Sequence, residues 1–132
     1  MTALALIFAS LAAALHVFIW TMESLTWKQP KTWKRFGLKS QADAQTTAPL
    51  AFNQGFYNLF LAIGVAIGVV LVAGHNLGPY NTAGWTLIVF GCGSMLAAAL
   101  VLVSTGKEFA QAAATQGLFP VIAVVTSVIA AR

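Results

Sequence analysis

The few side chains able to do chemistry in this 132-residue chain fall on three short stretches. The first is a stripe in the N-terminal segment, made of His16, Trp20, Glu23 and Trp27. Their spacing puts all four side chains on one face of an α-helix. Glu23 can supply negative charge, Trp20 a ring face for a cation, and His16 a group that exchanges a proton near neutral pH. The stripe is therefore suited to binding a cation or to moving a proton.

The second stretch is Asn53-Gln54-Gly55-Phe56-Tyr57-Asn58, which lies directly before the uncharged apolar run from Leu59 to Ala73. The third is Gln116, near the start of the last apolar segment. Polar side chains inside a bilayer cost free energy unless they find partners, so they mark a packed interior or a functional cavity. We expect these side chains to meet at one depth, in the cytoplasmic half of the membrane. The predicted ligand-binding residues are His16, Trp20, Glu23, Asn53, Gln54, Tyr57, Asn58 and Gln116.

Each of these residues also has a purely structural interpretation, which the sequence leaves open. A lone histidine in a membrane helix is commonly a hydrogen-bonded interior residue, and Glu23 could reach the headgroups and pair with Lys28 or Arg35. Asn and Gln side chains also join helices, through hydrogen bonds worth about 0.6 kcal/mol each. Tyr57 would suit the membrane interface, where aromatic residues are enriched.

The composition indicates an integral membrane protein. Hydrophobic residues make up 59% of the chain and charged residues only 8%, whereas a soluble domain carries about 25% charged residues. Three long segments are uncharged, at residues 1–22, 44–106 and 109–131. A spanning helix needs about 20 apolar residues, so the middle segment has room for two. We predict an all-α, four-transmembrane-helix bundle that forms a single domain over residues 1–132, with helices at about 2–26, 47–73, 82–104 and 109–131.

Local signals mark the helix ends and one packing face. Thr47-Ala48-Pro49 predicts the start of the second helix, since Thr is a good N-cap and Pro is tolerated in the first turn. The segment from Gly74 to Asn81, which contains His75, is rich in turn residues. Gly64-x-x-x-Gly68 offers a helix face that another helix can approach closely.

The charge distribution predicts the topology. Five of the seven Lys and Arg residues lie in the first connection, at Lys28, Lys31, Lys34, Arg35 and Lys39. We expect a multi-pass protein of the cell inner membrane. Under the positive-inside rule this loop is cytoplasmic, and the N- and C-termini then lie on the opposite, outer side. Because the cations cluster in a membrane loop, we expect no nucleic-acid partner. The aromatic residues of the loop, Trp33 and Phe36, either dip into the membrane surface or belong to an ordinary solvated loop.

The cysteine and histidine content restricts metal chemistry. The single cysteine, Cys92, cannot form an intramolecular disulfide, and a zinc site of four cysteines or of two cysteines and two histidines is excluded. With one histidine and one glutamate within the membrane, a metal site is possible but short of ligands. We therefore expect no metal and no cofactor.

Three motifs connect the chain to a known family. They are His16 and Glu23 ahead of Trp27, Asn53-Gln54-Gly55-x-Tyr57-Asn58 with Phe60-Leu61-Ala62 after it, and Gln116-Gly117-x-x-Pro120. Together they resemble a family of small bacterial membrane proteins that is classed as a domain of unknown function. The resemblance covers essentially the whole chain and implies a four-helix integral membrane protein. It implies no established activity.

Three functional classes stay open. The first is a protein whose cytoplasm-facing cavity binds or transports a small amphipathic or cationic molecule. Small multidrug transporters are similar in architecture and work as dimers, so a homodimer is conceivable, although Glu23 lies at the end of its helix and their motifs are absent. The second is an isomerase-like membrane enzyme on a lipid-like substrate, with His16 and Glu23 as the acid–base pair. The third is a structural or accessory subunit.

Overall fold

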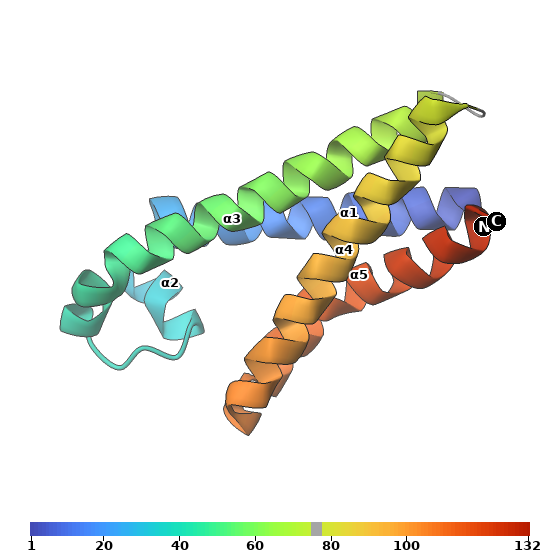
Figure 1. Cartoon of the computed structure of the whole chain (residues 1–132). Helices are drawn as coiled ribbons and strands as arrows, with labels where there is room; N and C mark the ends of the chain where they lie inside the picture. The colour runs from blue at the N-terminus through green and yellow to red at the C-terminus, as the bar shows by residue number, and fades with distance from the viewer. Residues whose placement is uncertain (75–77) are drawn as a thin grey trace. The chain divides into compact units, whose positions relative to one another are not determined.

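A computed structural model describes residues 1–74 and 78–132 of the chain (Figure 1). Every regular element in these residues is helical, which confirms the predicted all-α class. In chain order the elements are α1 (Thr2–Trp20), the π-helical turn η1 (Thr21–Leu25), α2 (Pro30–Arg35), α3 (Gln41–Gly74), α4 (Pro79–Thr105), the 3-10 turn η2 (Lys107–Phe109) and α5 (Ala110–Ala130).

Four helical stretches of the described chain are long and apolar enough to cross a membrane, as the uncharged segments predict. They are Thr2–Leu25, Gln41–Gly74, Pro79–Thr105 and Lys107–Ala130. Many of their large apolar side chains are exposed, as is expected where lipid takes the place of water. The chain is therefore a membrane-embedded protein. The predicted turn residue His75 lies outside the described residues.

The second long helix does not begin where the sequence predicts. Thr47-Ala48-Pro49 lies inside α3, which begins earlier, at Gln41. Ser40 provides the N-terminal cap, because its hydroxyl oxygen accepts a hydrogen bond of 3.0 Å from the backbone N–H of Asp43. Thr47 instead donates its hydroxyl to the Asp43 carbonyl, at 2.7 Å. The helix continues through Pro49, which lacks the backbone N–H that other residues donate to a helical hydrogen bond.

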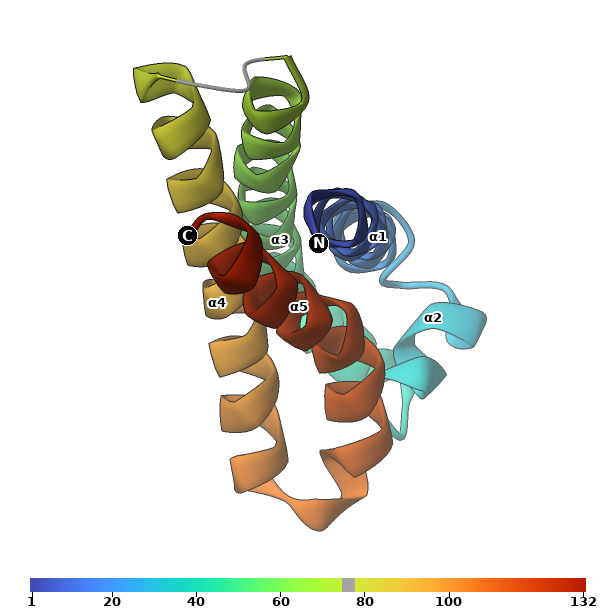
Figure 2. The same cartoon turned by 90° about the vertical axis from the view of Figure 1, so that its right-hand side faces the viewer.

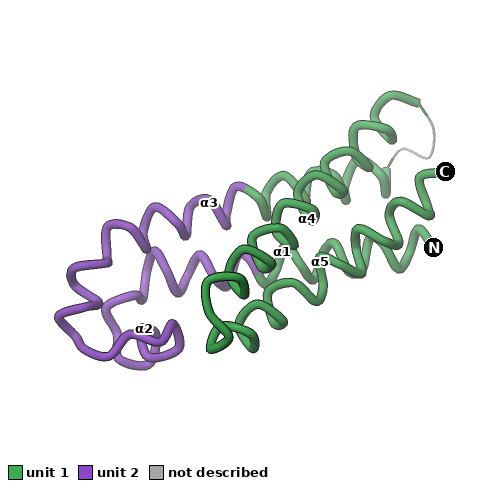
Figure 3. Tube along the Cα trace, turned by 60° about the horizontal axis from the view of Figure 1, so that its bottom comes forward, with its two compact units in different colours: residues 1–15, 61–132 green, residues 16–60 purple. Residues whose placement is uncertain are grey.

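The chain divides into two compact units, which are described one at a time (Figure 3). Unit 1 consists of residues 1–15 and 61–132, and unit 2 of residues 16–60. Within unit 1, α4 and α5 run side by side in opposite directions and are joined by the short turn η2 (Figure 2). Gly117 of α5 permits this approach, because a Cβ added there would lie only 3.1 Å from the Cβ of Ala99 on α4.

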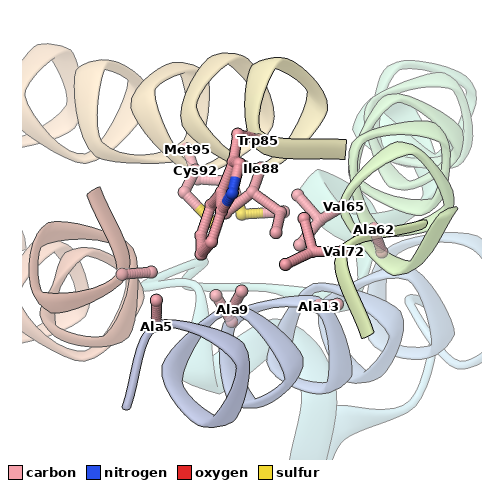
Figure 4. Packing of buried hydrophobic residues seen from close by; sticks show 12 residues of the cluster. Ala5, Ala9, Ala13, Ala62, Val65, Val72, Trp85, Ile88, Cys92 and Met95 are labelled. Carbon is pink, nitrogen blue, oxygen red and sulfur yellow. The ribbon is translucent and has the colours of Figure 1, made fainter. Parts of the chain in front are cut away.

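Small side chains fill much of the interior of unit 1 (Figure 4). Gly68 and Gly84 let α3 and α4 come together, since a Cβ on Gly68 would lie 2.8 Å from the carbonyl oxygen of Gly84. Gly64 faces open space, so only one glycine of the predicted pair serves close packing. The buried cluster consists of Ala5, Ala9, Ala12, Ala13, Ala62, Val65, Val72, Trp85, Ile88, Cys92, Met95 and Ala123.

Tryptophan side chains tie the basic connection of unit 2 to the first turns of α3. The indole N–H of Trp27 lies 3.1 Å from the Ala44 carbonyl and 3.2 Å from the Thr47 hydroxyl. Trp33 donates to the side-chain oxygen of Gln41 at 3.0 Å and is only 6% exposed. The interpretation in which Trp33 dips into the membrane surface is therefore wrong, because its ring and its N–H are already engaged within unit 2.

Candidate functional site

The end of the first membrane span is not a regular α-helix. Residues Thr21–Leu25 form the π-helical turn η1, and the backbone N–H of Thr26 bonds to the carbonyl of Thr21, five residues back, at 3.1 Å. Such turns are rare and occur frequently at functional sites. The wider turn presents Glu23 and Ser24 to the neighbouring part of α3 in unit 2.

Gly55 makes this close approach possible. A Cβ on Gly55 would lie 3.1 Å from the Cβ of Glu23 and 3.2 Å from the backbone nitrogen of Ser24, and it would collide with the Ser24 hydroxyl. That hydroxyl donates across the contact to the carbonyl of Phe52, at 2.9 Å. The π turn therefore packs directly against α3 at Gly55, the glycine of the Asn-Gln-Gly-x-Tyr-Asn motif.

The polar centre of unit 2 is a pair formed by Glu23 and Asn58. The amide nitrogen Nδ2 of Asn58 donates to Oε2 of Glu23 at 2.7 Å, and the two residues are 7% and 9% exposed, respectively. No described residue forms an ion pair with Glu23, so the pairing with Lys28 or Arg35 considered above is not formed. Arg35 instead reaches the sulfur of Met22, at 4.0 Å. A buried carboxylate with one neutral donor is incompletely compensated for its lost hydration.

Aromatic rings of the first span and α3 pack against one another in unit 2. The Trp20 ring packs edge-on against Phe56, with centroids 6.0 Å apart and planes at 74°. Phe56 also contacts Phe52 and Phe60, at 5.0 and 6.1 Å. Within the described part of the chain, the buried indole nitrogen of Trp20 has no hydrogen-bond partner. Trp20 therefore belongs mainly to an apolar stack.

An open groove lies next to the π turn and has a volume of about 450 Å³. We call it the Glu23 groove. One wall comes from the π turn and the basic connection, and the other comes from α3, in which Pro49 lies. Its lining residues are Glu23, Ser24, Leu25, Thr26, Trp27, Lys28, Gln29, Ala48, Pro49 and Phe52.

The structure brings together only part of the predicted ligand-binding set. Glu23 alone among those residues lines the groove, and Asn58, which does not line it, donates a hydrogen bond to Glu23. His16 is fully buried and Tyr57 is 58% exposed, so the structure does not gather them around one cavity. The remaining members are placed as follows: Trp20 is half-buried in the aromatic stack, Asn53 and Gln54 are exposed on α3, and Gln116 is half-buried on α5 in unit 1.

Most of the groove-lining residues were not predicted as binding residues from the sequence. The sequence of α3 nevertheless contains a pattern that indicates its contact face. Its buried residues in unit 2 are Ala44, Ala51, Gly55 and Asn58, at spacings of seven, four and three. This pattern of small residues identifies the face that meets a neighbour. Phe52 lies on the adjacent strip of the helix, three residues before Gly55, and could have been assigned to the rim of the contact.

The charged groups that line the groove are one carboxylate, Glu23, and one ammonium, Lys28. In residues 1–74 and 78–132, no three His, Cys, Asp or Glu side chains are grouped so that they could hold a metal ion. Cys92 is fully buried in the core of unit 1, away from any such group in the described chain.

The helices and this site define a class: a membrane-embedded, multi-helix protein with a buried carboxylate at the end of its first span. A family model described as "Protein of unknown function (DUF1304)" matches residues 10–128. The chain belongs to this family, and the match includes the π turn, Gly55 and Asn58. No curated protein and no solved structure matches the chain.

Proposed function

We propose that the chain is a multi-pass protein of the cell inner membrane whose Glu23 groove binds a small amphipathic cation from the cytoplasmic side. The cation-rich connection between α1 and α3 supports this orientation, because Lys and Arg concentrate in cytoplasmic loops. Both termini then lie outside. The groove is formed by residues of one chain, so binding does not require a second copy.

The observation that carries this proposal is the environment of the Glu23 carboxylate. It is 9% exposed, it accepts a hydrogen bond from Asn58, and no described residue supplies a cation to it. Such a carboxylate gains strongly from a cation, since charges attract more strongly where water is partly excluded. A ligand ammonium in the groove would supply that charge.

The other groove residues suit the apolar part of such a ligand. Leu25, Pro49 and Phe52 give an apolar surface beside the carboxylate. Trp27 also lines the groove, and an indole ring can hold a cation near its face. In this proposal Trp27 takes the role that the sequence analysis gave to Trp20.

Calorimetric titration of the full-length protein in detergent micelles tests the proposal, with n-octylammonium as the probe and n-octanol as its neutral match. We expect the wild type to bind the ammonium and not the alcohol. Glu23→Gln keeps an acceptor for Asn58 but removes the charge, so its affinity should fall at least about tenfold, or 1.4 kcal/mol.

Glu108→Gln is the matched control, because Glu108 is an exposed acidic residue in η2 of unit 1. This variant should bind n-octylammonium like the wild type. Equal binding by wild type and Glu23→Gln, or equal binding of octanol and octylammonium, would contradict the proposal. Movement of the same cation into proteoliposomes would then separate transport from binding alone.

A further inference from the structure

The Glu23 groove carries one group of each charge, and these two groups do not neutralise each other. Glu23 and Lys28 both line it, yet no ion pair joins them within the described residues. A simple alkylammonium would use only the carboxylate. We propose, building on the function proposed above, that the groove takes a zwitterionic phospholipid headgroup with a primary ammonium, of the phosphoethanolamine type.

The carboxylate discriminates between ammonium groups by hydrogen bonding. Asn58 occupies Oε2 of Glu23, and no described residue donates a hydrogen bond to Oε1. A primary ammonium has N–H donors for that oxygen, whereas a quaternary ammonium has none. A phosphoethanolamine headgroup therefore satisfies Oε1, and a phosphocholine headgroup of similar size and charge does not.

The phosphate is recognised at the rim of the groove. Lys28 is exposed there, and no described residue accepts a hydrogen bond from its ammonium group. Gln29 follows it in the lining and offers amide donors. An ammonium and an amide are suitable partners for phosphate oxygens. The neighbouring Lys31 is also exposed but does not line the groove, which makes it a matched control.

The acyl chains have an apolar path away from the headgroup. Leu25 and Phe52 line the groove and are 62% and 52% exposed, so their apolar surface continues outward. Leu25 is also the last residue of the first membrane span, and a groove at that level is reached by lipid headgroups. The ligand is therefore a membrane lipid and not a soluble zwitterion.

The test uses the full-length protein in micelles and the water-soluble dihexanoyl forms of phosphatidylethanolamine, phosphatidylcholine and phosphatidylglycerol, with inorganic phosphate as a further probe. We expect the ethanolamine lipid to bind about tenfold more tightly than the choline lipid, because of the added charge-assisted hydrogen bond. Lys28→Gln should weaken ethanolamine lipid binding by about three- to tenfold, while Lys31→Gln leaves it unchanged.

Octylammonium binding separates this inference from the function on which it rests. Lys28→Gln should bind octylammonium at least as tightly as the wild type, because that ligand has no phosphate and the Lys28 ammonium, which also lines the groove, would only repel it. Equal affinity for the ethanolamine and choline lipids, or equal loss in Lys28→Gln and Lys31→Gln, would overturn the lipid assignment while leaving cation binding intact. Tighter binding of phosphatidylglycerol or of inorganic phosphate would overturn it as well. Absence of Glu23-dependent octylammonium binding would remove the proposed function itself.

Discussion

Different kinds of interaction stabilise the interior of each of the two units. Unit 1 relies on close contact between small residues, such as Gly68 and Gly84, around a core rich in alanine. Unit 2 relies on polar groups that join separate segments, such as Asn58 to Glu23, Ser24 to Phe52 and Trp27 to Ala44. The contrast follows from the solvent that each part meets.

Moving an apolar side chain from lipid into a protein interior lowers its free energy only slightly. Helices within a membrane therefore associate through close van der Waals packing. Unit 1 has small residues at its contacts for this reason. Unit 2 includes the basic connection, whose exposed cations belong in water or among headgroups. There, hydrogen bonds can hold a buried carboxylate in place. A binding site for a polar headgroup is more easily built in such a unit than in a tightly packed apolar one.

Replacing a contact glycine of unit 1 should have the largest effect on stability. In Gly68→Ala the new methyl would meet the Gly84 backbone, and in Gly84→Ala it would meet the Gly68 carbonyl oxygen at 2.9 Å. Each change should lower the free energy of unfolding by about 1–3 kcal/mol, because backbone cannot move aside cheaply. Unfolding of the detergent-solubilised protein in increasing SDS measures this.

Gly64→Ala is the control, since nothing lies within 4 Å of a Cβ at Gly64. It should be neutral or raise stability by up to about 1 kcal/mol, the usual gain from replacing a helical glycine. Equal effects at Gly64 and Gly68 would show that close helix contact does not hold unit 1 together.

Removing the donor to Glu23 should have an effect of similar or smaller size, and it probes unit 2. Asn58→Leu leaves Oε2 of the buried carboxylate without its 2.7 Å hydrogen bond. The loss should be about 1–3 kcal/mol, the cost of a buried polar group left unpaired. In the double variant with Glu23→Leu, part of the loss should be recovered, because neither polar group is then buried alone. Strictly additive losses in the SDS titration would argue against the pair.

Removing the cap of α3 should have the smallest effect. Ser40→Ala deletes the acceptor for the Asp43 N–H and should destabilise the first turn of α3 by about 1 kcal/mol. The change should appear as faster hydrogen exchange in residues 41–46, with little effect on the SDS midpoint. Ser104→Ala in unit 1 is the control, because its hydroxyl only bonds back to Val101 within α4. Unchanged exchange in residues 41–46 would mean that Ser40 does not hold this end.

The class and the four spans could be predicted because they depend on composition, and long uncharged segments have few alternatives. The start of α3 could not be placed as simply. Pro49 is a stronger conventional boundary signal than Ser40, yet the cap at Ser40 and the contact between Trp27 and Ala44 hold the additional turns in helical form. Those turns are stabilised by a tertiary contact, which local sequence rules do not contain.

Glu23 could be singled out as a candidate site residue because it is an acidic side chain at the end of a long apolar segment. The residues that surround Glu23 could not be predicted. The stripe from His16 to Trp27 assumes α-helical spacing, and that spacing does not hold in the π turn. Whether a segment forms a π turn depends on the residues that pack against it. In this chain Gly55 packs against the turn. The exposure of Asn53, Gln54 and Tyr57 has a simpler cause, since six consecutive residues of a helix cannot share one face.

Helix α3 is unusually long, at 34 residues. At 1.5 Å per residue it measures about 51 Å, whereas the hydrocarbon interior of a bilayer is about 30 Å thick. The length of an α-helix is fixed. In a thinner bilayer, α3 must therefore tilt more or extend further beyond the hydrocarbon region. Ala48 and Pro49, which form one wall of the groove, lie in the first nine residues of this helix, ahead of its apolar run. In the orientation proposed above, membrane thickness would set how far that wall stands above the acyl chains.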